Sequence, residues 1–501
     1  MFEANSLRCR LLMLCTVAVV AAAAAVGFSP GLGRAQPMTL DEAIDQAIHH
    51  SSRGAILEET ERIAESSYRA KKINFYVPLI TINGALPSYD VDQSYKFFGG
   101  STRKQLYKTS DFRMNSFIKL EQSLLTGGSL AMSANLNRSQ SRYPDTNPEV
   151  PSGSFLDENG RQGYFEFRLT QPIFKPSTLK NELLDRTENL ELARIGRREE
   201  EAALRKEVAE AFLGLIEAEV QDSMQALTLD AASLKAEIDS VKWQDGVIAE
   251  EARLEAASAK LDAELARREA TDKLQEQQRA LALLLDRPVE GTLQLVEPEA
   301  GEALSAEQLL KMKSGWEKSL PVRRALENRS RSKRMASYTA KGKSLTGDLT
   351  ASYAAGRGKV SLEDRPDEDI NTNGWGVSLN LSYPIWDGGS GSAATQAARA
   401  EANRAELELV QAKQAAQAEI ARLVQQVDVG YRRLGIQQSR VKLADDKLAI
   451  ARERFADGRI STLQLREAEI DRLEARAGYL AELKTYLGNK ITLEGSFAGQ
   501  E

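Results

Sequence analysis

The chain has 501 residues, of which 66 are lysine or arginine and 72 are aspartate or glutamate, so its formal net charge is −6. This mildly acidic balance excludes a protein that binds nucleic acid through a basic surface. The two cysteines, Cys9 and Cys15, both lie within the first 35 residues. The rest of the sequence therefore excludes disulfides, thiolate nucleophiles and cysteine-based metal sites.

The first 35 residues have the pattern of a secretory signal peptide. Arg8 and Arg10 form a basic start, and Leu11–Val26 is a nearly continuous apolar run. The sequence Gly33-Arg34-Ala35 has the small-x-small pattern of a cleavage site. We therefore predict that residues 1–35 are a signal peptide that is removed on export across the inner membrane.

Neither a lipid anchor nor a spanning helix is expected in the exported chain. Bulky Leu14 stands before Cys15, where lipidation requires a small residue. After residue 35 no apolar stretch approaches the roughly 18 residues of a transmembrane helix. If the chain crosses a membrane, it must do so as a closed β-barrel, because only helices and barrels satisfy the backbone hydrogen bonds in lipid.

The exported chain is predicted to begin with a helix followed by strands. Thr39 and Glu42 have the spacing of a capping box, which marks the start of a helix. We expect this helix to end near Pro78 and to lead into a strand at Leu79.

The segment 113–140 is predicted to form a β-hairpin. Apolar residues alternate with polar ones on both sides of the turn Thr126-Gly127-Gly128, as in two strands that share one apolar face. The flanking stretches 88–112 and 139–162 are polar and rich in turn-forming residues, so we expect outward loops there.

Two long helical hairpins are predicted, at 179–285 and 390–490. Both segments are rich in alanine, leucine, glutamate, arginine and glutamine, which favour helices. Each is broken once by an Asp-Gly turn, at Gly246 and at Gly458. Helices of this length have no globular core in which to bury an apolar stripe, so they must pack along other helices.

The similarity between the two halves predicts two tandem structural repeats, 36–300 and 301–501. The spacing of 72 residues between the end of the last strand and the turn of the helical hairpin is the same in both halves, Phe174 to Gly246 and Trp386 to Gly458. The first half has a net insertion of 54 residues in its strand region, which includes the hairpin 113–140.

The second repeat has the same order of elements as the first. Ser305 and Gln308 repeat the capping-box start of a helix, and strands are predicted at 345–356 and 374–386. Within the last strand, apolar and polar residues alternate from Val377 to Tyr383. This alternation suits a barrel with a water-filled lumen, and a half-buried sheet of a soluble protein has the same pattern.

Taken together, these segments resemble the TolC-type outer-membrane efflux protein family. The resemblance rests on the order and duplication of a short strand, a long alanine-rich helix and a second long helix. It also rests on three motifs: the start at 38–48, Pro-Ile-Trp-Asp-Gly-Gly at 384–389, and Phe-Ala-Asp-Gly-Arg-Ile-Ser at 455–461. Nearly the whole exported chain is covered by the resemblance.

The resemblance implies an α+β membrane protein that works as a homotrimer. Its subunits share one transmembrane β-barrel in the bacterial outer membrane and one long α-helical coiled-coil barrel in the periplasm. The implied function is the passive, gated exit duct of a tripartite efflux or type I secretion system. The implied partners are outer-membrane lipid, a periplasmic adaptor (membrane fusion) protein and, indirectly, an inner-membrane pump.

The resemblance also assigns roles to residues at the turns of the helical hairpins. Two side chains, Gln464 and Glu467, would form the periplasmic constriction. Three copies of Glu467 would attract cations there, and the positive charge of neighbouring Arg466 could offset this attraction. A solvated helix face is the alternative for these residues, and a plain turn is the alternative for the tips. The residues implied in adaptor docking are Asp245, Gly246, Val247, Ile248, Asp457, Gly458, Arg459 and Ile460.

Two questions stay open at the level of sequence. The hairpin 113–140 either adds two barrel strands, giving six per subunit instead of the usual four of the family, or forms an extracellular lid. The duct also has a rival, a non-conducting periplasm-spanning coiled-coil structural protein or adhesin stalk. An enzyme is not expected, with no catalytic residues, cofactor or metal assigned, and the only histidines, His49 and His50, are predicted at the surface.

Overall fold

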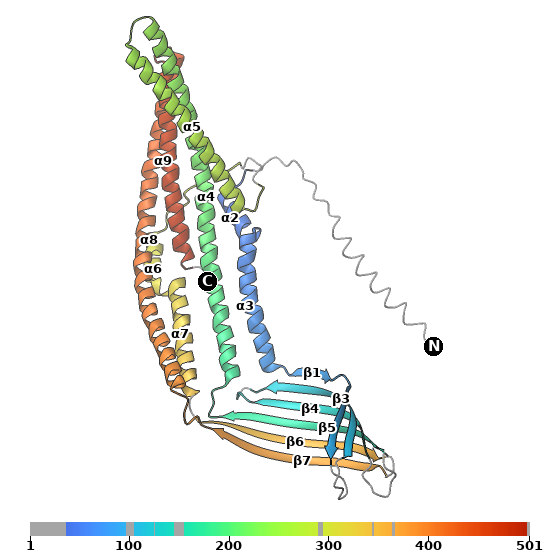
Figure 1. The fold of residues 1–501 in the computed structure, drawn as a ribbon. Helices are drawn as coiled ribbons and strands as arrows, with labels where there is room; N and C mark the ends of the chain where they lie inside the picture. Colours follow the sequence, from blue (N-terminus) through green and yellow to red (C-terminus); the bar gives the residue numbers. More distant parts are fainter. Residues whose placement is uncertain are drawn as a thin grey trace. The chain divides into compact units, whose positions relative to one another are not determined.

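The computed structural model describes residues 37–96, 105–124, 126–144, 155–288, 294–342, 345–362 and 366–497 (Figure 1). The predicted signal peptide lies outside these residues. The chain forms two compact units, each drawing segments from both predicted repeats, so the repeat boundaries stay a prediction. The first unit takes in residues up to Ala47, Val208–Ala300 and Gln438–Lys484, and the second Ile48–Glu207, Gly301–Gln437 and Thr485–Glu501.

Helices and one antiparallel sheet make up the described chain. The helices are α2 (Leu40–His49), α3 (Ser52–Tyr76), α4 (Thr178–Gln244), α5 (Glu250–Leu284), α6 (Ala306–Ser314), the 3-10 turn η1 (Trp316–Lys318), α7 (Leu320–Lys341), α8 (Ser390–Ala456) and α9 (Thr462–Gly495). The strands are β1 (Leu79–Gly84), β2 (Ser88–Lys96), β3 (Gln105–Ser123), β4 (Ser129–Pro144), β5 (Phe155–Ile173), β6 (Thr346–Leu362) and β7 (Glu368–Ser382). The long arms α4 and α8 have the same length, 67 residues.

Both predicted capping boxes are formed, but each predicted single helix is broken. Thr39 N–H donates to Glu42 Oε2 (2.9 Å) and Glu42 N–H to Thr39 Oγ1 (3.3 Å), and Ser305 caps α6 in the same way with Gln308. The first helix nevertheless stops at His49, because the buried hydroxyl of Ser51 caps a new helix, α3. Its counterpart divides into α6, η1 and α7.

The first unit contains two helical hairpins that are held by small residues and ion pairs. In α5, buried Ala256, Ala263 and Ala270 recur every seven residues, so neighbouring helices can approach closely along one stripe. The hairpin α4–α5 is tied by Arg267, whose Nη1 donates to the backbone carbonyl of Asp222 at 2.7 Å. His49, the last residue of α2, and His50 are exposed as predicted, and both belong to the second unit.

The second unit contains a row of four long helices in the order α3, α4, α7 and α8. Glu61 of α3 accepts from two arginines of α4, which lowers the pKa of its carboxyl, first through the hydrogen bond from Arg197. Helix α7 has seven basic side chains and one acidic one, and it forms ion pairs with acidic residues on both neighbours. On α8 its partner is Glu406, which Arg329 Nε approaches to 2.7 Å.

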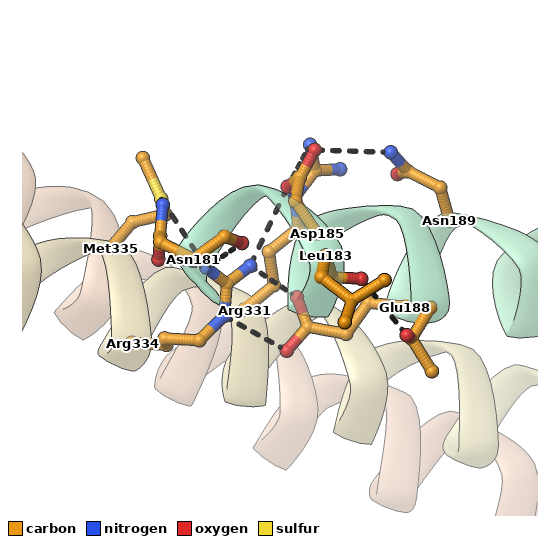
Figure 2. A network of polar contacts seen from close by, with 9 residues as sticks. Asn181, Leu183, Asp185, Glu188, Asn189, Arg331, Arg334 and Met335 are labelled. Carbon is orange, nitrogen blue, oxygen red and sulfur yellow. Dashed lines mark hydrogen bonds and ion pairs between the residues drawn. The ribbon is translucent and has the colours of Figure 1, made fainter. Parts of the chain in front are cut away.

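Arg334 is the centre of the contact between α7 and α4 (Figure 2). Its guanidinium donates to both carboxylate oxygens of Glu188, with Nε–Oε1 at 3.1 Å and Nη2–Oε2 at 2.5 Å. It also donates to the side chain of Asn181, and Asp185 pairs with both Arg334 and Arg331. The cationic helix α7 is therefore tied to α4 by a network of hydrogen bonds and ion pairs.

The sheet of the second unit has seven strands in the order β1-β3-β4-β5-β6-β7, with β2 also paired to β3 (Figure 1). Strands β1 and β2 pair with different halves of β3, Leu79–Gly84 with Ser116–Glu121 and Ser88–Lys96 with Gln105–Arg113. They therefore share one edge position, and the sheet is six strand positions wide. The edges are β1 with β2 on one side and β7 on the other.

The sequence-based prediction of outward loops at 88–112 and 139–162 is wrong for most of these residues. Strand β2 and the polar ends of β3, β4 and β5 occupy them, while 97–104 and 145–154 lie outside the described residues. Pairing with a neighbouring strand satisfies the backbone N–H and C=O groups of these segments whether or not their side chains are apolar. The alternation of apolar and polar residues therefore gave no signal there. No helix in the described part of the chain is long and apolar enough to cross a membrane.

Candidate functional site: hairpin turns and an apolar sheet face

The turns of the two helical hairpins have the same backbone geometry. Gly246 and Gly458 both have positive φ, +70° and +71°. Val247 N–H donates to the Lys242 carbonyl, and Arg459 N–H donates in the same way to that of Arg454, both at 2.8 Å. Each long helix thus ends in a Schellman motif, which requires a residue in the left-handed region and favours glycine there.

The side chains at the two turns differ. Val247 is 70% exposed at the first turn, and the indole of Trp243 lies against the Arg253 guanidinium, 4.8 Å from the ring centroid. At the second turn exposed Arg459 forms a loose ion pair with Asp457 at 3.6 Å. The first turn therefore presents an apolar tip and the second a charged one.

The predicted constriction residues start α9 and have different surroundings. Ser461 N–H donates to Gln464 Oε1 at 3.0 Å, and Gln464 N–H donates to Ser461 Oγ at 3.3 Å. This reciprocal capping box fixes the Gln464 amide at the helix start, a role that the Ser-x-x-Gln spacing could have indicated. Glu467, one turn on, is exposed.

Arg466 is engaged by acidic partners that the sequence did not reveal. Its Nη1 donates to Glu469 at 2.7 Å, and its Nε lies 2.9 Å from Asp230 of α4. The hydrogen bond to Glu469, first of all, raises the pKa of the guanidinium. Arg466 thus ties the second helical hairpin to α4, and its charge is shared with carboxylates other than Glu467.

The second feature is a continuous apolar face on the sheet. Residues directly opposite each other in neighbouring antiparallel strands project from the same face. The pairing register therefore aligns one row across all six strand positions, Ile80, Leu120, Met132, Phe167, Tyr353 and Trp375. On the edge strand β7 the face continues at two-residue steps through Val377, Leu379 and Leu381, each more than half exposed.

The opposite face of the sheet is polar and charged. Lys119 Nζ pairs with Glu121 at 2.8 Å, and Glu166 pairs with Arg168. These pairs lie on strands β3 and β5, one step out of phase with the apolar row. The alternation predicted from the sequence is therefore carried by a sheet with one apolar face and one polar face.

Residues 328–498 match the family model described as outer membrane efflux protein. This part of the chain is an outer membrane efflux protein domain. The efflux-protein domain contains part of α7 and all of β6, β7, α8 and α9. This match confirms the resemblance to the TolC-type outer-membrane efflux protein family. No curated protein matches the chain.

Solved structures of outer-membrane proteins have the same fold along most of the chain. The alignment with the CmeC outer membrane channel of Campylobacter jejuni covers 92% of this chain and 85% of CmeC, with 13% identity and a TM-score of 0.58. The alignment with the outer membrane protein VceC of Vibrio cholerae covers 92% of this chain and 97% of VceC, with 14% identity and a TM-score of 0.57. The alignment with the MtrE outer membrane channel of Neisseria gonorrhoeae covers 92% of this chain and 89% of MtrE, with 15% identity and a TM-score of 0.55.

Proposed function

We propose that the chain is the outer-membrane exit duct of a tripartite efflux or type I secretion system, a passive conduit built from three copies. The apolar row that crosses all six strand positions carries the proposal. An apolar face backed by a charged one suits a barrel wall between lipid and a wet lumen. The row of long helices provides the periplasmic tunnel, and the efflux-protein domain and the shared fold support the same role.

Fractionation and channel recordings test this proposal against the rival rod. A duct fractionates with the outer membrane, runs as a heat-modifiable trimer in detergent, and conducts ions when reconstituted in planar bilayers. A structural rod is recovered as a soluble elongated species that leaves bilayers insulating. Recovery in the soluble fraction together with absent conductance rejects the duct.

The turns at Gly246 and Gly458 are proposed to dock the periplasmic adaptor. The two turns share the same Schellman backbone geometry, and exposed Val247 offers an apolar contact at the first turn. A Val247→Cys variant carrying a short cross-linker should capture an adaptor protein in intact cells. The matched control is Glu269→Cys, on an exposed part of α5 away from the turn, and equal capture by both variants contradicts docking at the tip.

Glu467 is proposed to line a cation-attracting constriction in the trimer. Its carboxylate is exposed, and the neighbouring cation of Arg466 is shared with Asp230 and Glu469. Three carboxylates around one axis raise the local cation concentration. Glu467→Gln should therefore lower the cation preference measured by reversal potential, while the exposed loop variant Glu302→Gln should leave it unchanged.

A further inference from the structure

The β3–β4 hairpin runs the full height of the sheet. Strand β3 has 19 residues and β4 has 16, and β4 pairs with β5 from Ser129 to Pro144. The turn between them is packed against the segment that leads into α4. Thr126 Oγ1 donates to Gln171 Oε1 at 2.5 Å, and Gln171 Nε2 donates back to the Thr126 carbonyl at 3.3 Å.

The position of this turn distinguishes a wall from a lid. A Cβ on Gly127 would lie only 2.8 Å from Ser177, just before the first residue of α4, so the turn is closely packed at the helical end of the sheet. Gln122 Nε2 also donates to the carbonyl of Phe75, near the end of α3. A lid on the far end of the sheet would not bring the hairpin turn to the helices.

The hairpin also continues the apolar face in register. Leu120 of β3 and Met132 of β4 stand directly opposite each other, between Ile80 of β1 and Phe167 of β5. Their neighbours Lys119 and Ser133 are opposite each other on the polar face. A one-residue slip of either strand would exchange the two faces, so the inserted strands have the register that a common wall requires.

With the hairpin counted, the width of the sheet matches the width of the helical row. Strands about 4.8 Å apart, tilted about 40° as in barrels, occupy about 6.3 Å each around the circumference. Six positions therefore span about 38 Å, while four helices spaced 8–10 Å apart span about 32–40 Å. A sheet without β3 and β4 would have four positions and span about 25 Å.

We propose that β3 and β4 are strands of the barrel wall and that this hairpin sets the bore of the duct. The inference rests on the proposed function, because it takes three copies to close the wall. Six positions per copy then give eighteen around the barrel, with a backbone diameter of about 36 Å instead of about 24 Å for a wall without the hairpin. The duct then admits bulkier hydrated cargo in the membrane, since diameter grows with strand number.

Single-cysteine labelling tests the wall position in the full chain. Both cysteines, Cys9 and Cys15, lie in the predicted signal peptide, so the exported chain is already a background without thiols. Met132→Cys and Ser133→Cys report the apolar and polar faces of β4, and Val377→Cys and Ser378→Cys report those of β7. Each variant is labelled with an environment-sensitive fluorophore in phosphatidylethanolamine–phosphatidylglycerol vesicles and quenched with spin-labelled lipid or with aqueous iodide.

The expected result is the same alternation on both strands. Lipid should quench the labels at positions 132 and 377, and iodide those at 133 and 378. If β7 alternates while both β4 labels are quenched by iodide, the hairpin lies outside the wall and the inference is overturned. If β7 itself fails to alternate, the proposed function fails instead.

Electron cryo-microscopy of the purified full chain provides a second readout that needs no variant. Six wall positions per copy and a backbone diameter near 36 Å support the inference. Four positions per copy, with the hairpin folded over one end, overturn it. Light scattering on the same sample gives the number of copies, which tests the trimer separately from the path of the hairpin.

Discussion

Arg334→Met should loosen the contact between α7 and α4 more than any exposed charge substitution of similar size. The guanidinium makes a bidentate pair with Glu188 and lies 3.5 Å from Asp185 (Figure 2). The side chains of Arg334 and Glu188 are only 17% and 13% exposed. Methionine keeps most of the aliphatic stem, so the substitution removes chiefly the charge and its hydrogen bonds.

The expected loss of unfolding free energy lies between the losses measured for exposed and for buried ion pairs. Exposed pairs contribute about 0–1 kcal/mol, and removing one partner of a buried pair costs about 3–5 kcal/mol, because it leaves an uncompensated charge. Since water still reaches both groups, we expect a loss of about 2 kcal/mol for Arg334→Met. Glu188→Gln keeps one acceptor oxygen and should lose less.

Urea unfolding of the protein in detergent, followed by the helical circular-dichroism signal, measures this loss. Arg404→Met is the matched control, because Arg404 pairs with Glu408 on the exposed surface of α8, with side chains 68% and 49% exposed. We expect at most about 0.5 kcal/mol for the control. The double variant Arg334→Met with Glu188→Gln should lose less than the sum of the single variants, since both remove one interaction.

Equal losses for Arg334→Met and Arg404→Met would refute the reasoning. That outcome would mean that partial burial does not strengthen the network between α4 and α7. Strict additivity in the double variant would likewise mean that Arg334 and Glu188 are not coupled.

Three further predictions concern other contacts of the second unit. The pKa of Glu406 is lowered to about 2, first by the hydrogen bond from Arg329. Glu406→Gln should therefore lower the unfolding free energy at pH 7, and this loss should shrink as the pH falls below the ordinary pKa of 4.5 and vanish below about pH 2. A loss that is independent of pH contradicts this prediction. The hydroxyl of fully buried Tyr486 has no hydrogen-bond partner among the described residues, so Tyr486→Phe should be neutral or raise the unfolding free energy by up to about 1 kcal/mol, and a clear loss would point to a hidden partner. Gly127 has a φ of +90°, and an added Cβ would lie close to a side chain, so Gly127→Ala should lower the unfolding free energy by about 1–3 kcal/mol. A Cβ on Gly374 in β7 would meet nothing within 4 Å, so Gly374→Ala should change the unfolding midpoint little. Equal effects of the two variants would contradict the turn geometry.

Several elements could be predicted from local signals in the sequence. The Asp-Gly turns predicted the ends of α4 and α8, because only a residue that tolerates positive φ closes a Schellman motif there. The capping boxes at Thr39 and Ser305 predicted two helix starts. The alternation around Thr126-Gly127-Gly128 predicted the hairpin that became β3 and β4.

Other features depend on contacts between residues far apart in the chain and could not be predicted from the sequence. Strand β2 and the outer ends of β3, β4 and β5 are polar, and they form because a neighbouring backbone pairs with them. Arg334 and Glu188 are 146 residues apart in the chain, and no local pattern could pair them. The six-position width of the sheet depends likewise on strand order and register, which are set by contacts between segments far apart in the sequence.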